Sequence, residues 1–179
     1  MKIIETQLQG AFVIEPTIYP DERGFFGRLW SHAEFEPHGM ETRFVESNFS
    51  FNKTAGTLRG MHYQAAPHGQ AKLVRCTRGA IFDVGIDLRP NSSTFKQWVG
   101  FELSAENHRM LYLPGDFGHG FQTLTDNTEV FYQVSAPYAP DSTRGVRWDD
   151  PAFGIEWPTV PQRIIIQRDR DYANFMGTP

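Results

Sequence analysis

The chain has 179 residues, of which 40% are hydrophobic, and a formal net charge of −4. This length and composition predict one folded domain over residues 1–179 and exclude a disordered chain. They also exclude a membrane protein of the helical type, because no apolar run approaches the about 20 residues that a spanning helix needs. An acidic balance without a long basic run argues against nucleic-acid binding.

The start of the chain and its cysteine content indicate the compartment. The apolar run after Met1 is too short for a signal peptide and is interrupted by Glu5. Cys76 is the single cysteine of the sequence, which excludes an internal disulfide and is typical of a reducing compartment. We therefore expect a cytoplasmic protein.

The predicted elements are two short helices with many strands between them. The first helix covers residues 31–36, where Ser31 and Glu34 have the spacing of a capping box and Pro37 follows. The second covers about residues 169–175. Strands rich in Val, Ile, Phe, Thr and Tyr are predicted at residues 71–77, 80–88, 97–103, 110–113, 120–124 and 129–135.

Short strands with almost no helix between them predict an all-β fold. Antiparallel strands that follow one another closely form a β-sandwich or barrel, whereas a parallel sheet needs a helix in each connection. Turns are expected at Arg78-Gly79 and at residues 90–92, because Gly, Pro and Asn interrupt the strands there.

Alternation along residues 81–88 places Asp83 and Asp87 on one face of a strand and the apolar side chains on the other. Two interpretations are open for Asp83. It either lies in water on an amphipathic strand, or it points into a polar barrel interior, where a carboxylate can orient a base or bind sugar hydroxyls.

The segment of residues 56–64 carries Arg59 and His62 in a β-prone context. On a regular strand these two side chains would face opposite ways, but a bulge at Gly60 would bring them together. A structural role for His62 is as compatible with the spacing as catalysis is. Histidine is nonetheless the side chain whose ordinary pKa suits proton abstraction near neutral pH.

Three further residues have both a structural and a chemical interpretation. Lys72 is either a solvated strand end or a cation that stabilises an enolate oxygen. His119 is either a packed turn residue or a site residue. Tyr132 is either a core tyrosine or an acid that protonates a carbanion on the side opposite a histidine.

Metal and nucleotide motifs are not found in the sequence. His62 has no second histidine one residue away and no glutamate soon after it, so a cupin-type metal cluster is not expected. There is no P-loop and no dinucleotide-binding glycine fingerprint.

Several segments together resemble the dTDP-4-dehydrorhamnose 3,5-epimerases and related nucleotide-sugar epimerases, and they occur in family order over nearly the whole chain. The matching segments are residues 21–26 (DERGFF), 58–64 (LRGMHYQ), 71–75 (AKLVR), 82–84 (FDV), 103–107 (LSAEN), 114–121 (PGDFGHGF) and 147–151 (RWDDP). The resemblance implies a metal-free cupin-type jelly roll without a cofactor, a nucleotide-diphosphate sugar as substrate, and a homodimer with an exchanged N-terminal strand.

The resemblance also implies roles for individual residues. His62 would be the general base, oriented by Asp169, Lys72 would stabilise the enolate, and Tyr132 would supply a proton on the opposite face. Tyr138 would stack on the nucleotide base. The residues that would hold the sugar and the diphosphate are Arg23, Asn48, Arg59, His119 and Arg168.

Four positions depart from the family pattern. Arg28 and Thr143 stand where glutamate is common, Glu46 where glutamine is usual, and Gln133 where a lysine often follows the family tyrosine. Arg28 and Glu46 are expected at the substrate, so exchanged charges there would change which ligand is accepted.

The leading hypothesis is thus inversion of C3 and C5 of a nucleotide-linked 4-keto-6-deoxyhexose. Its alternatives are inversion at C3 only, or action on a CDP- or GDP-linked sugar, including a heptose. A metal-dependent cupin enzyme and a non-catalytic sugar-nucleotide binder are alternatives from other classes.

Overall fold

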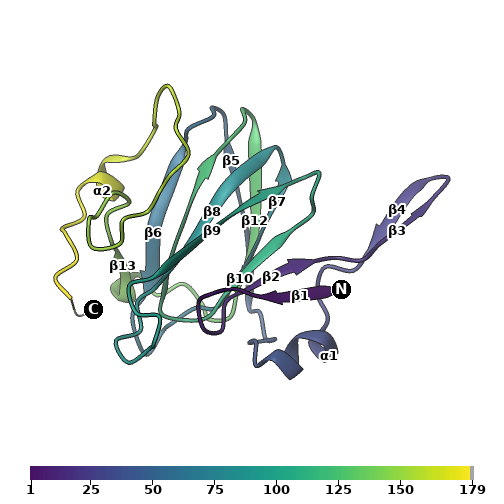
Figure 1. Ribbon diagram of the computed structural model, residues 1–179, viewed down its shortest axis with the longest axis horizontal. Coiled ribbons are helices and arrows are strands. Elements are labelled where there is room, and N and C mark those ends of the chain that lie inside the picture. Colours follow the sequence, from purple (N-terminus) through teal and green to yellow (C-terminus); the bar gives the residue numbers. More distant parts are fainter. Residues whose placement is uncertain (178–179) are drawn as a thin grey trace.

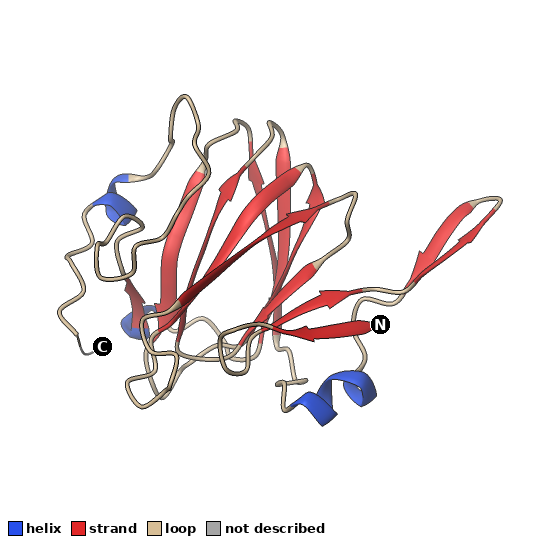
Figure 2. Ribbon diagram, in the orientation of Figure 1, coloured by secondary structure: helices blue, strands red, loops and turns tan. Residues whose placement is uncertain are grey.

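The structure is a computed structural model in which residues 1–177 are described. Two antiparallel sheets face each other and form a jelly roll, as the sequence predicted (Figures 1 and 2). In spatial order the larger sheet contains β1 (Lys2–Glu5), β2 (Phe12–Glu15), β10 (Met110–Leu113), β7 (Lys72–Arg78), β12 (Thr128–Val134) and β5 (Glu46–Asn52).

The second sheet has five strands and faces the first. Its order is β13 (Thr143–Gly145), β6 (Leu58–Gln64), β11 (Phe117–Thr123), β8 (Ala80–Asp87) and β9 (Trp98–Ser104). A separate hairpin of β3 (Ile18–Asp21) and β4 (Gly24–Gly27) projects away from both sheets on the right of Figure 1.

Apolar side chains fill the space between the sheets and also cover their outer faces. Val74 and Val130 from the larger sheet meet Ile81 and Phe121 from the smaller one in the central core. A second cluster packs Phe35 against the outside of the larger sheet, and a third packs the C-terminal segment against the outside of the smaller sheet.

Strand β8 therefore has two buried faces. Val84 and Ile86 belong to the outer cluster, whereas Ile81 belongs to the central core and Asp83 is completely buried on the same inner face. The interpretation that Asp83 lies in water is wrong, because its strand is central in the sheet and covered on both sides.

The predicted strands agree with the observed ones to within three residues at every end. The first helix is α1 (His32–Phe35), continued by the 3₁₀ turn η1 (Glu36–His38). The capping box predicted there is wrong: Ser31 makes no side-chain cap, and Glu34 instead accepts a hydrogen bond from the amino group of Met1 at 2.8 Å.

The second predicted helix is mostly wrong. The observed α2 spans Gln167–Arg170 and ends near the start of the predicted segment, so the two overlap only at residues 169 and 170. Beyond it, the backbone N–H of Phe175 donates to Asp150 and the Phe175 ring packs against Phe153. These tertiary contacts draw the chain over the sheet, and a helix would not satisfy them. A further 3₁₀ turn, η2, spans Pro140–Ser142.

None of the helices within residues 1–177 is long and apolar enough to cross a membrane.

Candidate active site

A cavity of about 500 Å³ opens between the two sheets, next to the central core. Phe121 belongs both to that core and to the cavity wall. Most of the site residues predicted from the sequence line this cavity: Arg59, His62, Lys72, His119, Tyr132, Tyr138, Arg168 and Asp169.

A bulge in β6 turns Arg59 and His62 toward the same cavity, as predicted. His119 on β11 is paired with His62 and Phe121 is paired with Arg59, so three residues of β6 advance where β11 advances two. The bulge contains Gly60, whose φ is +134° and whose position would put a Cβ atom 2.5 Å from the Cα of Gly120. Only glycine fits both this φ and this close approach.

His62 forms a hydrogen bond with a buried carboxylate. Its Nε2 lies 2.8 Å from Oδ1 of Asp169, and the other oxygen of Asp169 accepts the backbone N–H of Gly60 at 3.2 Å. Burial acts to raise the pKa of Asp169, but hydrogen bonds from His62, Gly60 and Arg168 outweigh it and lower the pKa. An ionised Asp169 favours the tautomer of His62 that has its proton on Nε2 and its lone pair on Nδ1.

Lys72 is buried at the start of β7 and lines the cavity with 7% of its surface exposed. The interpretation as a solvated strand end is wrong, because the opposite sheet covers this position. Burial lowers the pKa of Lys72 to about 8. The side chain thus stays mainly charged at neutral pH in a poorly solvated place, where its field is screened less than in water.

Tyr132 approaches the cavity from the larger sheet, opposite β6. The ring packs against the central core, and the residue is half-buried. Burial raises the pKa of the Tyr132 phenol, so the group keeps its proton at neutral pH.

His119 forms a second histidine–carboxylate pair in the cavity. Its Nε2 lies 2.8 Å from Oδ1 of Asp83, whose other oxygen is buried and has no hydrogen-bond partner among the described residues. Burial raises the pKa of Asp83, and the contact with His119 only partly offsets this effect.

Inversion through an enolate requires a base, a cation and an acid, and a histidine, a buried lysine and a protonated tyrosine of the kinds that can supply them line this one cavity. The family profile described as dTDP-4-dehydrorhamnose 3,5-epimerase matches residues 5–176 of the chain. The chain belongs to the dTDP-4-dehydrorhamnose 3,5-epimerase family.

Known epimerases are similar to the chain over most of their length. The dTDP-4-dehydrorhamnose 3,5-epimerase of Methanothermobacter thermautotrophicus is 44% identical over 99% of this chain and 96% of its own. The crystal structure of the Bacillus anthracis enzyme with TDP and PPi bound is 43% identical, covers 97% of this chain and 99% of its own, and has a TM-score of 0.92. A 3'-monoepimerase from Streptomyces bikiniensis in complex with dTDP-quinovose is 33% identical, covers 96% of this chain and 86% of its own, and has a TM-score of 0.88.

The mouth of the cavity in this epimerase-family chain is polar and partly exposed. Arg59 donates to the amide oxygen of Asn52 at 2.8 Å, and Arg168 donates to Asp169 at 3.1 Å. Tyr138 is 63% exposed and lines the mouth, so its ring is free to contact a ligand.

Four predicted substrate contacts do not line the cavity of the single chain. Asn48 is on β5, where it pairs with Tyr132, and Glu46 accepts the backbone N–H of Tyr138 at 3.1 Å. Arg23 pairs with Asp21 at 2.7 Å on the projecting hairpin, and Arg28 lies 3.5 Å from Glu34 just after it.

The remaining departures from the family pattern fall on different surfaces. Thr143 lines the cavity, and its hydroxyl donates to the carbonyl of Ala139 at 3.3 Å. Gln133 follows Tyr132 on β12 and has the opposite side-chain direction, so it lies on the outer face of the larger sheet.

Polar residues of the cavity wall that sequence reasoning missed include Ser50, Gln64 and Gln70. The Ser50 hydroxyl is buried and has no hydrogen-bond partner among the described residues. For Gln64 a signal was present, because a residue two positions after His62 shares its face of the strand.

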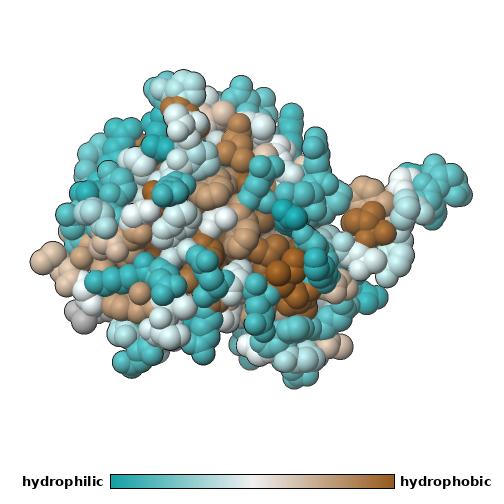
Figure 3. Space-filling view, in the orientation of Figure 1, coloured by the Kyte–Doolittle hydropathy of each residue, from teal (hydrophilic) through white to brown (hydrophobic). Residues whose placement is uncertain are grey.

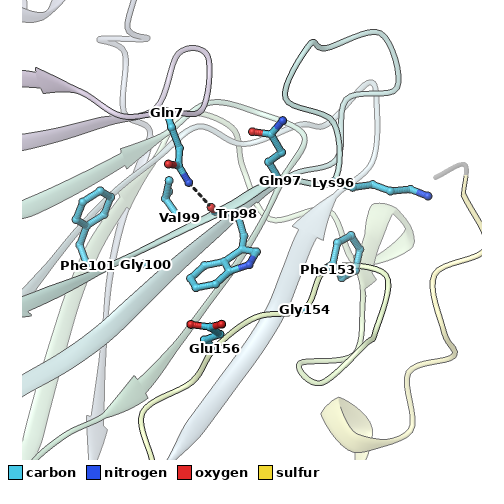
Figure 4. Close-up of a pocket in the computed structure, with 10 residues that line it drawn as sticks. All are labelled: Gln7, Lys96, Gln97, Trp98, Val99, Gly100, Phe101, Phe153, Gly154 and Glu156. Carbon is cyan, nitrogen blue, oxygen red and sulfur yellow. Dashed lines mark hydrogen bonds between the residues drawn. The ribbon is translucent and has the colours of Figure 1, made fainter.

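A second hollow runs along the edge strand β9 (Figure 4). Gln7 donates to the backbone carbonyl of Trp98 at 3.1 Å and so occupies part of the strand's open edge, while Lys96 and Glu156 lie at the rim. The described residues that line this groove include no histidine or tyrosine, and the acid–base groups are concentrated in the cavity between the sheets.

Within residues 1–177 no three His, Cys, Asp or Glu side chains are grouped so that they could hold a metal ion.

Proposed function

We propose that the chain, acting as one domain over residues 1–179, inverts C3 and C5 of a dTDP-linked 4-keto-6-deoxyhexose without a cofactor. The observation that carries this proposal is the placement of His62 and Tyr132 on facing sheets around one cavity. A sugar ring between them has a base on one face and an acid on the other. This arrangement suits inversion of a carbon centre.

The C4 ketone makes the first step possible. It acidifies the hydrogens at C3 and C5, because their removal leaves an enolate instead of an unstabilised carbanion. His62, with its lone pair on Nδ1 and its Nε2 held by Asp169, takes the proton. The charge then moves to the C4 oxygen, where the buried Lys72 ammonium stabilises it.

Tyr132 completes the inversion by giving its proton to the other face of the enolate. Its raised pKa fits this role, because the phenol remains protonated until the carbanion forms. The imidazolium of His62 and the phenolate of Tyr132 then return to their starting states by proton exchange with water. The same sequence at the second carbon gives the doubly inverted product.

The nucleotide part is assigned to the polar mouth. Tyr138 offers an exposed ring for the base, and Arg59, His119 and Arg168 offer cationic or hydrogen-bonding groups for the diphosphate and the sugar. We infer the dTDP linkage from the two dTDP-4-dehydrorhamnose 3,5-epimerases that are 43% and 44% identical to this chain.

We further propose a homodimer in which the hairpin of β3 and β4 from one copy reaches the cavity of the other. The hairpin exposes Tyr19, Phe25 and Phe26 at 58%, 57% and 65%, and its apolar surface is visible in Figure 3. The outer face of β5, the edge strand of the larger sheet, exposes Phe49 at 73%. Exposed apolar patches of this kind often mark a protein–protein interface. The exchanged arm would bring Arg23 and Arg28 of one copy to the substrate bound by the other.

Proton exchange in heavy water tests the function. The protein is incubated with dTDP-4-keto-6-deoxyglucose in D₂O, and the product is examined by mass spectrometry and proton NMR. Two deuterium atoms, at C3 and C5, are the expected result. One deuterium at C3 would indicate a monoepimerase, and exchange confined to CDP- or GDP-linked sugars would move the substrate to another nucleotide. Absence of exchange in all of them would refute an epimerase.

The two alternatives from other classes are tested on the same protein. A non-catalytic binder predicts binding of dTDP without turnover in the wild type. We expect His62→Ala to abolish exchange and to keep its affinity for dTDP within about tenfold. Unchanged turnover in this variant would support a noncatalytic role for His62. A metal-dependent enzyme predicts a stoichiometric metal in the purified protein by elemental analysis.

The buried free thiol of Cys76 is in keeping with the cytoplasmic location expected from the sequence.

A further inference from the structure

The loop that carries Tyr138 is held by side chains and not by a sheet. Each residue of this loop, which spans 136–139, has at least one backbone group bonded to a side chain from outside the loop. Gln70 donates to the carbonyl of Ala136 at 2.7 Å, and Glu46 accepts the N–H of Tyr138 at 3.1 Å. The two remaining residues, Pro137 and Ala139, are both bonded to Gln64.

Gln64 uses its whole amide group for this purpose. Its Nε2 donates to the carbonyl of Pro137 at 3.2 Å and to that of His68 at 2.8 Å, and its Oε1 accepts the N–H of Ala139 at 2.7 Å. The bonds to Pro137 and Ala139 lie on either side of Tyr138. One side chain therefore holds the residues on both sides of Tyr138 by hydrogen bonds.

The position of Gln64 connects this loop to the proposed base. Gln64 is the last residue of β6, two positions after His62, so both side chains lie on the same face and line the same cavity. It is 4% exposed. The strand that carries His62 thus also supplies two of the bonds that hold the loop of Tyr138.

We infer that Gln64 is a positioning residue for substrate binding, which holds Tyr138 over the cavity mouth in register with the catalytic groups of β6. The inference rests on the proposed function, since it requires a nucleotide base on Tyr138. Glutamine suits the role because two donors and one acceptor are needed at one buried point. A glutamate lacks the donors and an apolar residue lacks both.

The first test is a double-mutant cycle read out as the Kd for dTDP. Gln64→Ala in the wild-type background is expected to raise the Kd about tenfold, as loss of a buried hydrogen-bonded group does. In a Tyr138→Ala background, the same change is expected to alter the Kd by less than about twofold, because the ring that Gln64 positions is gone. An equal loss in both backgrounds overturns the inference.

The second test measures how the Kd for dTDP depends on pH. A merely structural role of Gln64 would not give the dependence described below. In Gln64→Glu the carboxylate faces the carbonyls of His68 and Pro137 and cannot donate to them. Protonation restores one donor. The Kd of this variant, divided by that of wild type at the same pH, should fall toward one as the pH is lowered, while the ratio for Gln64→Ala should stay constant. Parallel behaviour of the two variants contradicts the inference.

Gln122 is the matched control. It is a fully buried glutamine on β11 whose amide donates to the carbonyl of Pro158 at 2.9 Å and accepts from Arg163 at 2.8 Å, and it does not line the cavity. Gln122→Ala should lower the melting temperature as Gln64→Ala does, yet leave the Kd for dTDP within about twofold. If Gln122→Ala raises the Kd equally, the effect is one of general stability and the inference fails.

Wild-type protein separates this inference from the proposed function. If wild type does not bind dTDP, the proposed function fails and the inference fails with it. If wild type binds dTDP and epimerises the sugar, but the cycle shows no coupling between Gln64 and Tyr138, the inference alone is wrong.

Discussion

Two histidines in the cavity each lie 2.8 Å from a buried aspartate, yet the two carboxylates differ in their surroundings. Asp169 receives hydrogen bonds from His62, Gly60 and Arg168, whereas Asp83 receives one from His119. At Asp169 the hydrogen bonds outweigh burial and lower the pKa, whereas at Asp83 burial prevails and raises the pKa. A stable anion beside His62 suits a base, which must hold a positive charge after it has taken a proton.

Tyr132 gives the sharpest prediction at the scale of single residues. Tyr132→Phe removes the proposed acid but leaves His62 and Asp169 in place. Epimerised product is expected to form at least about 100-fold more slowly. Exchange of the substrate hydrogens with D₂O should persist, because His62 can return a deuteron to the face from which it took the proton. NMR of the recovered substrate checks this. Loss of exchange together with inversion would show that Tyr132 is needed for the first step as well.

Lys72 predicts the alkaline limit of activity. In the proposed mechanism only the ammonium form of Lys72 stabilises the enolate. Burial lowers the pKa of Lys72 to about 8, so the charged form is lost as the pH rises through about 8. We expect kcat/KM to fall over this range. Lys72→Arg should be slower but should lose the fall near pH 8, because a guanidinium stays charged there. A fall that persists unchanged in Lys72→Arg would assign it to another group.

Strand β6 is the element on which the site depends. It carries Arg59, His62 and Gln64, and the bulge at Gly60 lets residues with an odd separation share the cavity. Its partner β11 supplies His119 opposite His62. The two glycines that approach each other here, Gly60 and Gly120, make room for this geometry.

Gly60→Ala tests the role of the bulge. The new Cβ would lie 2.5 Å from the Gly120 Cα at a φ of +134°, and we expect the free energy of unfolding to fall by about 3 kcal/mol. Turnover should fall about 100-fold, because displaced catalytic groups lose their alignment. Denaturant unfolding and kcat are the measurements.

Gly154→Ala is the control for backbone strain alone. Gly154 has a φ of +61°, and a Cβ added there would have no atom within 4 Å. The variant should lose about 1 kcal/mol of stability and keep its turnover. Equal effects at the two glycines would mean that the close packing at Gly60 has no special role.

At the scale of the whole molecule, the projecting hairpin is the feature that a single chain does not explain. It leaves Arg23 outside the cavity and exposes aromatic side chains to water. A dimer in which the arms exchange would account for both, because each cavity would receive the arm of the other copy.

Mixed dimers test this exchange. Arg23→Ala and His62→Ala should each be nearly inactive, but after unfolding and refolding together they should recover about one quarter of the wild-type activity, since half of the dimers contain one complete site. The recovery is measured as deuterium exchange at C3 and C5. Activity equal to the mean of the two separate variants would show that Arg23 acts on its own chain or not at all.

Much of the fold was predictable because strands leave a local record. Alternation and turn residues located β7, β8, β9, β10, β11 and β12 to within three residues. The helix expected at residues 169–175 failed because Phe175 is held by Asp150 and Phe153, which are distant in sequence. The capping box failed for the same reason, since Glu34 binds the amino terminus.

The sequence by itself determined strands β7 to β12, the β class, the family and the chemical types available for catalysis, because side-chain period and residue type are local properties. Only the tertiary structure decided which of those side chains meet. The bulge turned Arg59 toward His62, the facing sheets buried Lys72 and Asp83, and the bonds of Gln64 linked Tyr138 to β6. Burial and convergence depend on segments far apart along the chain, and short-range patterns carry no record of them.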